Sequence, residues 1–322
     1  MKLITQLKSW LNIEPSIGCP NDCVYCHRHT DGDFDLKIPQ PTVAIGALFR
    51  CLQRHPLFTP NQTHLSINGV KSDAFLPENK KRTFQFLKLL DKMGYSNMVI
   101  ITTKGLIDKN DAKNLRKLKH IKPVIFVTYS EMPRMLEKIS NSQRIQSLKN
   151  LKKSGGIKCI LYWRPLIKGI NDSFKQIEKV LTIGEKYADA FVLSGLRLTP
   201  AIKKYMEKKK VKLAKENWHP DHKIISGSTK TNIYREYLNK NCKIPLFLKS
   251  SCAVSYLEKL PDFNAHWINP EKNCSPFCPN EQKIRCKKQF SKKIPVLLKK
   301  KLINLSREEK TFFRQKYRLP IE

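Results

Sequence analysis

Apolar runs with a β-type pattern alternate with amphipathic helical stretches from about residue 11 to residue 195. The strand candidates are 11–16, 63–68, 98–103, 123–128, 158–163 and 190–194. The helix candidates between them are 42–54, 79–93, 109–119, 144–153 and 173–186. Alternation of this kind is typical of parallel βαβ units, and the sequence predicts six of them.

Six such units predict an α/β fold, a partial (β/α)6 TIM-like barrel with a C-terminal cysteine-rich extension. Parallel strands cross over right-handedly, and the sheet curls into an open barrel when helices cover only its outer face. A doubly wound sheet is the alternative. In both architectures ligands bind at the carboxyl ends of the strands, in the loops that lead into the helices.

The composition changes after residue 200 and divides the chain into three predicted parts. Residues 1–200 form the barrel. Residues 201–241 form a basic helical connector, because their lysine-rich run shows no clear apolar stripe. Residues 242–322 form a cysteine-rich region with a basic tail, since residues 287–322 carry 12 Lys and Arg against three acidic residues.

The charge of the chain suggests a polyanionic partner. Sixty-one Lys and Arg against 27 Asp and Glu give a formal net charge of +34. A field of that sign attracts nucleic acid, DNA or RNA, although a general enrichment in lysine gives the same composition.

No run of 18 consecutive apolar residues is present, and the N-terminal residues 1–8 are too polar for a secretory signal. We therefore expect a cytoplasmic protein with no membrane partner. Because cytosolic thiols stay reduced, the ten cysteines indicate metal or redox chemistry rather than a disulfide framework.

Three cysteines, Cys19, Cys23 and Cys26, lie within eight residues just after the first predicted strand. Three thiolates on one short loop can hold three corners of a [4Fe-4S] cluster and leave the fourth iron open. A structural zinc site is the alternative, with His27 or His29 as the fourth ligand.

The Cys-x-x-x-Cys-x-x-Cys spacing, with the aromatic Tyr25 before the last cysteine, resembles the radical S-adenosylmethionine superfamily. The resemblance implies that the open iron binds the amino and carboxylate groups of S-adenosylmethionine. It further implies that an electron from an external donor cleaves the sulfonium to methionine and a 5′-deoxyadenosyl radical, which abstracts hydrogen from a substrate. The protein's part in such chemistry is to position the cofactor and exclude side reactions.

Residues 12–200 are most similar to the branch that contains spore photoproduct lyase and DNA-repair photolyase-like proteins. The resemblance rests on stretches 67–77, 99–106, 127–130, 144–157 and 164–172. It implies the following cofactor-binding residues: Tyr25, Ser72, Asp73, Thr103, Lys104, Ser130 and Arg164. The simpler interpretations are turn or helix-terminal roles for Ser72 and Asp73, a surface position for Lys104 and a structural salt bridge for Arg164. The hydrogen-donor cysteine of the lyase has no match here.

A second cysteine group consists of Cys252, Cys274, Cys278 and Cys286, with 21, 3 and 7 residues between successive members. Four thiolates can close a second [4Fe-4S] cluster or an all-cysteine zinc site. Radical enzymes often carry an extra cluster in such a position, which favours iron and sulfide. Zinc and free cysteines remain alternatives.

The leading hypothesis is a radical S-adenosylmethionine enzyme that modifies or repairs a nucleic acid or nucleotide. A second hypothesis keeps the chemistry but gives it a peptide or small-molecule substrate. A third, from another class, is a basic nucleic-acid-binding protein stabilised by zinc.

Overall fold

The computed structural model describes residues 3–7, 9–216, 218–264, 266 and 270–288. Within that part of the chain, eight strands form one sheet in the order β1-β2-β5-β6-β7-β8-β9-β10. Neighbouring strands from β2 to β10 are parallel, and β1 pairs with β2 antiparallel. The strands are β1 Ile4–Gln6, β2 Leu11–Ile13, β5 Leu65–Ile67, β6 Met98–Thr103, β7 Lys122–Thr128, β8 Lys158–Leu166, β9 Ala190–Gly195 and β10 Leu246–Phe247.

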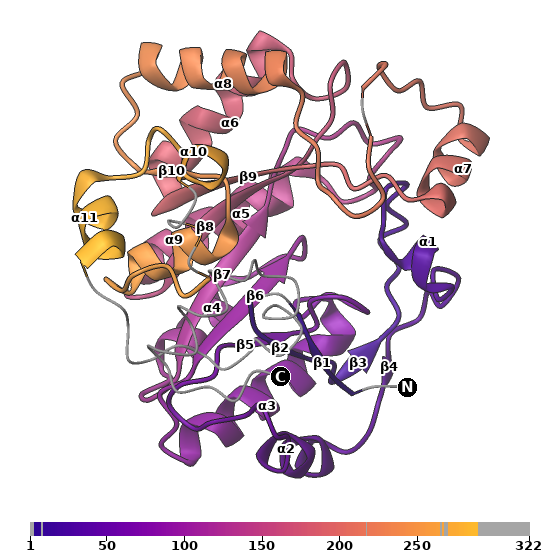
Figure 1. The fold of residues 1–322 in the computed structure, drawn as a ribbon. Coiled ribbons are helices and arrows are strands. Elements are labelled where there is room, and N and C mark those ends of the chain that lie inside the picture. The colour runs from indigo at the N-terminus through magenta and orange to yellow at the C-terminus, as the bar shows by residue number, and fades with distance from the viewer. Residues whose placement is uncertain (1–2, 8, 217, 265, 267–269, 289–322) are drawn as a thin grey trace, which may run out of the picture.

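One face of the sheet is covered by the helices that connect the strands (Figure 1). These helices are α2 Ile45–Gln53, α3 Pro77–Lys92, α4 Lys109–Arg116, α5 Asn141–Ser154, α6 Phe174–Tyr187 and α8 Gly227–Asn239. Alternate strand residues point to this face, as Val99 and Ile101 of β6 do, and pack with apolar helix residues such as Leu87 and Leu148.

The opposite face lines the lumen of the open barrel. Ile100 of β6, Phe126 of β7 and Val192 of β9 point there and form a separate apolar cluster. That cluster is completed by Ala253 and Val254 of helix α9, Ser250–Leu257. The C-terminal segment therefore fills part of the lumen, and the sheet is not covered by connecting helices on both faces.

The predicted partial barrel is confirmed. The doubly wound alternative is wrong, because connecting helices cover only one face of the sheet. The six predicted strands correspond to β2 and β5 to β9, and the five predicted helices to α2 to α6. Strands β1 and β10 were not predicted, because runs of three and two residues carry no readable periodicity.

The first predicted strand, 11–16, is interrupted. Strand β2 ends at Ile13, and the chain then forms β3, Ser16–Ile17, which pairs antiparallel with β4, Gln40–Pro41, in a small separate sheet. The loop between β3 and β4 carries the first cysteine group and the short helix α1, Arg28–Asp31. Gly18 opens the loop at a φ of +93°, and a Cβ there would lie 2.5 Å from the backbone oxygen of Ile38. Only glycine fits this close crossing of the two arms.

Residues after 200 continue the barrel as well as extending it. Helix α7, Pro200–Lys208, contacts α1, whereas α8 packs on α6 and places Ile233 in the main core. Two short helices, α10 Pro270–Asn273 and α11 Asn280–Lys288, lie beside α9 (Figure 1). The predicted basic tail lies outside the described residues from 289 onward. None of the described helices is both long and apolar enough to cross a membrane.

Candidate active site

The first cysteine group lies on a loop that is held at both ends by hydrogen bonds. The backbone N–H of Cys19 donates to the oxygen of Leu36 at 3.0 Å. The buried Arg28 guanidinium joins the same two arms, donating to the oxygens of Cys19 at 3.3 Å and Leu36 at 2.8 Å. Within the loop, the N–H of Cys26 donates to the oxygen of Cys23 at 3.0 Å. The three cysteines are therefore presented by a fixed backbone.

The thiols of this group lie in a shielded environment and interact with one another. Burial raises the pKa of Cys19 to about 11 and that of Cys23 to about 12, and the neighbouring Cys26 acts in the same direction on both. Thiols held protonated in this way lose their protons when a metal centre binds and supplies positive charge. The three residues fit a cluster with three cysteine ligands.

A mononuclear zinc site fits this group less well. Zinc–sulfur bonds of about 2.3 Å place the ligand atoms of a tetrahedral site within about 4 Å of one another. In the described part of the chain, one group of three ligand atoms lies within 4.8 Å of one another. That group contains none of Cys19, Cys23 and Cys26, so these thiols are not gathered as a tetrahedral zinc site requires. His29 instead stacks on Phe34, with ring centroids 3.5 Å apart, and His27 contacts Arg197.

Lys104, at the carboxyl end of β6, reaches the cysteine loop. Its Nζ lies 3.3 Å from the Sγ of Cys23, 2.8 Å from the Oη of Tyr25 and 3.1 Å from Oε1 of Glu137. The structure thus brings two predicted cofactor residues, Tyr25 and Lys104, against the predicted cluster ligand Cys23. The surface interpretation of Lys104 does not hold, because its side chain is 19% exposed and engaged on three sides.

Glu137 is a member of the site that sequence analysis missed. It lies in the irregular segment between β7 and α5, and its carboxylate accepts a hydrogen bond from Tyr25. It also pairs with Arg144, at 3.2 Å, and both side chains are fully buried. Burial alone would raise the pKa of Glu137, but Lys104 and Arg144 hold it below its ordinary value. The carboxylate is therefore the counter-charge of two buried cations.

Asp73 fixes the end of β6 rather than offering a free carboxylate. Oδ1 accepts from the hydroxyl of Thr103 at 2.5 Å, and Oδ2 accepts from the backbone N–H groups of Lys104 at 2.7 Å and Gly105 at 3.3 Å. Ser72 donates to the oxygen of Gly18 at the base of the cysteine loop. In this arrangement Ser72, Asp73 and Thr103 position the loop and Lys104.

Ser130, just after β7, is fully buried, and its Oγ has no hydrogen-bond partner among the described residues. Its position is set by Asn171, whose side-chain amide donates to the Ser130 backbone oxygen at 2.8 Å. A buried hydroxyl without a partner costs free energy, so such a group is usually explained by a ligand or a water. Ser130 therefore fits a polar group of a bound cofactor.

Arg164 lies on β8, two strands away from Lys104, and the Arg164–Pro165 peptide bond is cis. Its Nη1 donates to the Oη of Tyr162 at 3.3 Å, with the guanidinium carbon 5.1 Å from the centre of the Tyr162 ring. No carboxylate pairs with it within the described chain, so the salt-bridge interpretation finds no support.

The C-terminal cysteines also gather in space. Burial raises the pKa of Cys252 well above its ordinary value, and Asp262, Cys274, Cys286 and Cys278 add to that rise, so these groups lie within electrostatic reach. The backbone N–H of Asp262 donates to the Sγ of Cys286 at 3.3 Å.

Two further ligand-type residues stand beside them that the sequence analysis did not name. The ligand atoms of Cys252, Asp262 and His266 all lie within 4.8 Å of one another. Such a cluster is compatible with a metal centre in this region.

The cysteine-rich segment packs against the amino ends of the strands. The Nζ atom of Lys158, the first residue of β8, lies 2.7 Å from Glu258, and Phe263 stacks on His64 next to β5, with centroids 4.3 Å apart. This is the end of the barrel opposite the first cysteine group. Ser250 of α9, by contrast, lies inside the barrel, 3.4 Å from the Oη of Tyr162.

Comparison with known proteins gives matches at the level of structure. No family model and no curated protein sequence matches the chain. A spore photoproduct lyase variant with bound AdoMet and dinucleoside spore photoproduct superposes with a TM-score of 0.57 at 14% identity, over 73% of this chain and 76% of that one. The chain therefore shares the fold of this lyase.

A second match supports the same fold. A radical SAM methyltransferase from Sphaerobacter thermophilus aligns with a TM-score of 0.50 at 16% identity, over 76% of this chain and 68% of the other. Both matches share the partial barrel of this chain, in which Cys19, Cys23 and Cys26 lie on the loop between β3 and β4.

Proposed function

We propose that this protein is a radical S-adenosylmethionine enzyme. The observation that carries the proposal is the contact of Lys104 with Cys23 and Tyr25 at the carboxyl ends of the strands of a radical S-adenosylmethionine fold. A shielded three-cysteine loop beside a cation, in that fold, suits a site-differentiated [4Fe-4S] cluster with an anionic ligand on its open iron.

Each residue of the site has a proposed role in binding the cluster or the cofactor. Cys19, Cys23 and Cys26 would hold the cluster, and Lys104 would neutralise the methionyl carboxylate of S-adenosylmethionine. Tyr25 and Ser130 would contribute hydroxyl groups, whereas Ser72, Asp73 and Thr103 would set the positions of the loop and of Lys104. When bound, the cofactor supplies reductive cleavage of its sulfonium, with one electron from an external donor, to methionine and a 5′-deoxyadenosyl radical.

We further propose that Cys252, Cys274, Cys278 and Cys286 hold a second metal centre. An auxiliary [4Fe-4S] cluster is favoured, and a structural zinc ion is the alternative. We propose the cytoplasm as the compartment, because thiols that bind metals stay reduced there.

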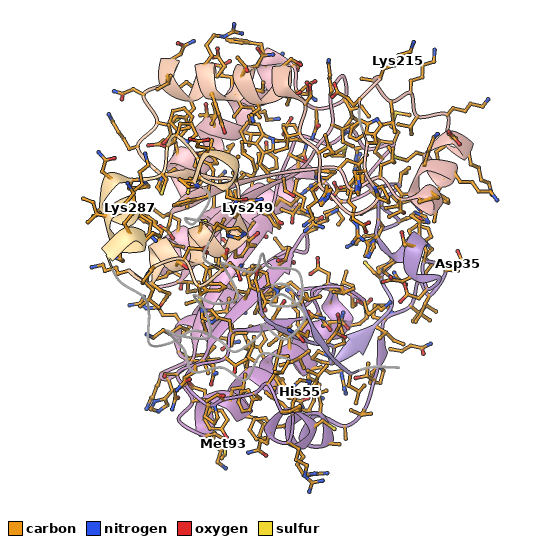
Figure 2. All side chains as sticks on the ribbon, viewed as in Figure 1. Asp35, His55, Met93, Lys215, Lys249 and Lys287 are labelled. Carbon is orange, nitrogen blue, oxygen red and sulfur yellow. The ribbon has the colours of Figure 1, made fainter. Side chains whose placement is uncertain are left out.

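For the substrate we propose a nucleic acid or a nucleotide. The net charge of +34 supports it, as does the dinucleoside bound by the structurally similar lyase. Among the exposed lysines, Lys215 lies at the upper right and Lys287 at the left edge of the molecule in Figure 2. A peptide or small molecule is the second candidate, and a zinc-stabilised binding protein is the third.

The experiment that tests the proposed activity is reductive cleavage of S-adenosylmethionine by the anaerobically reconstituted full chain. We expect 5′-deoxyadenosine and methionine to form in equal amounts only when a strong one-electron reductant is present. Iron-loaded protein that yields neither product would contradict the proposal.

Binding to nucleic acid separates the substrate classes. We expect oligonucleotide affinity to fall as a power of the salt concentration, with a slope that reports the number of phosphates contacted. Affinity that is negligible at physiological salt, together with tight binding of a peptide, would favour the second candidate.

A further inference from the structure

A second group of cations lies beside the cysteine loop. One member is Arg164, for which the family resemblance implied a cofactor contact and which has no role in the cofactor site proposed above. We define the basic cluster as Arg164 on β8, Arg197 just after β9 and Lys223 in the segment before α8. Nη1 of Arg197 lies 3.5 Å from Nε2 of His27, the residue that follows Cys26. The cluster is therefore next to the site of the proposed radical chemistry.

The fold brings Lys223 to this place through a close backbone crossing. Ile224 forms a bridge with Leu196 at the end of β9, and a Cβ on Gly195 would lie 1.6 Å from the backbone oxygen of Ile224. Arg197 also donates to the backbone oxygen of Pro220. Segment 220–225 therefore crosses the end of β9. Only glycine at position 195 leaves room for this crossing.

The basic cluster has no buried carboxylate beside it, unlike Lys104 in the cysteine site. Lys104 is balanced by the buried Glu137, whereas in the described part of the chain neither Arg164 nor Lys223 forms an ion pair. Arg197 pairs only with Asp221, at 3.3 Å, whose side chain is 71% exposed. Repulsion by Arg164 lowers the pKa of Lys223, against the opposing effect of a hydrogen bond with Tyr162, so the two cations lie within electrostatic reach of each other. Lys223 is exposed and open to a ligand from solution.

Hydroxyl groups complete the surroundings of the cluster. Tyr162 accepts from Arg164 at 3.3 Å, and Ser250 of α9 lies 3.4 Å from the same phenol oxygen. Burial alone would raise the pKa of Tyr162, but Lys223 and Arg164, with hydrogen bonds from Ser250 and Ser194, lower it to about 7. The environment stabilises a negative charge even on a tyrosine side chain.

We propose that Arg164, Arg197 and Lys223 bind a phosphate group of the substrate, as a phosphomonoester or a phosphodiester. Three cations surrounded by hydroxyl groups match a group that carries one to two charges and several acceptor oxygens, and the planar guanidinium forks suit phosphate geometry. The methionyl carboxylate of the cofactor is assigned above to Lys104, which together with Arg144 exceeds the charge of Glu137 by one.

The proposal rests on the proposed function and narrows its substrate class. A phosphate held beside His27 places the attached nucleoside next to the cysteine loop, where a hydrogen atom can be abstracted. The phosphate would be bound by residues of β8, of the end of β9 and of segment 220–225. The substrate is then positioned through a group that takes no part in the reaction.

The test compares anion binding by the reconstituted full chain and by Arg164→Gln, Lys223→Gln and Lys88→Gln variants, using calorimetry at fixed ionic strength. Lys88 is an exposed residue of α3, so Lys88→Gln removes one positive charge outside the basic cluster. The probes are inorganic phosphate, uridine 5′-monophosphate, a short single-stranded oligonucleotide and S-adenosylmethionine.

We expect Arg164→Gln and Lys223→Gln to weaken binding of uridine monophosphate or the oligonucleotide by roughly tenfold to a hundredfold, and Lys88→Gln to leave it within about twofold. Preference for the nucleotide indicates a phosphomonoester substrate, and preference for the oligonucleotide a phosphodiester. Equal weakening by all three substitutions, or weakening of S-adenosylmethionine alone, would overturn the proposal.

A second readout follows the ionisation of Tyr162 and keeps all three cations of the basic cluster in place. The ultraviolet difference between wild type and Tyr162→Phe reports ionisation of Tyr162, which faces Arg164, Lys223, Ser194 and Ser250. A bound phosphate disfavours the phenolate, so ionisation should move to higher pH when the nucleotide is added. An unchanged titration at saturating nucleotide would place the phosphate elsewhere. If the nucleotide shifts the ionisation of Tyr162 but the protein does not cleave S-adenosylmethionine, the phosphate site stands and the proposed function is contradicted.

Discussion

Replacement of Glu137 by glutamine is expected to lower the free energy of unfolding by about 3–5 kcal/mol, because it leaves buried cations without their counter-charge. The Glu137 carboxylate lies 3.1 Å from Lys104 and 3.2 Å from Arg144, and Tyr25 also donates to it. Glutamine keeps the shape but removes the charge. Urea unfolding of the variant, followed by circular dichroism, measures the loss.

The matched control is Glu178→Gln, which removes one carboxylate from an exposed pair with Lys240 at 3.2 Å. Exposed pairs contribute about 0–1 kcal/mol, so this variant should unfold close to wild type. Equal midpoints for the two variants would show that the buried network does not stabilise the fold. Because the pKa of Glu137 is held below its ordinary value, the stabilisation should persist at neutral pH and be lost only as the pH falls through that lowered pKa.

Replacement of Cys23 by alanine is expected to reduce S-adenosylmethionine cleavage to the background level. Cys23 is the buried member of its group and the one that Lys104 contacts, so its loss removes a proposed cluster ligand and the sulfur that Lys104 faces. A cluster with two remaining cysteine ligands is not held firmly enough to be reduced in place. The readout is 5′-deoxyadenosine formed under reductant.

Cys51→Ala is the control, because Cys51 is an exposed residue of α2 and belongs to neither group of cysteines. It should retain wild-type cleavage. Substantial cleavage by the Cys23 variant would remove the first cysteine group from the proposed active site.

The fold was largely predictable because its elements are regular. Parallel strands buried on both faces give continuous apolar runs, as in Met98–Thr103, and the intervening helices carry capping residues such as Asp108 and Ser173. What the sequence did not predict were the short strands β1 and β10 and the filling of the lumen by α9. Those features depend on tertiary pairing, which leaves no local period in the sequence.

The candidate site was predictable where a motif or a strand end marks it. Tyr25 and Lys104, both predicted from the resemblance, lie against each other at the cysteine loop, whereas Asp73 is turned toward the end of β6. Glu137 and Lys223 were not predictable, because each lies in an irregular segment whose path is set by contacts far along the chain. Asp262 and His266 belong to the same class, since only folding brings them to Cys252.

Iron and sulfide content after anaerobic reconstitution tests the central claim most directly. The comparison is between wild type and a variant with alanine at Cys19, Cys23 and Cys26. We predict about eight irons per chain in wild type and about four in the variant, whose remaining iron belongs to the second centre. Stoichiometric zinc without iron, or iron content unaffected by the three substitutions, would contradict the account.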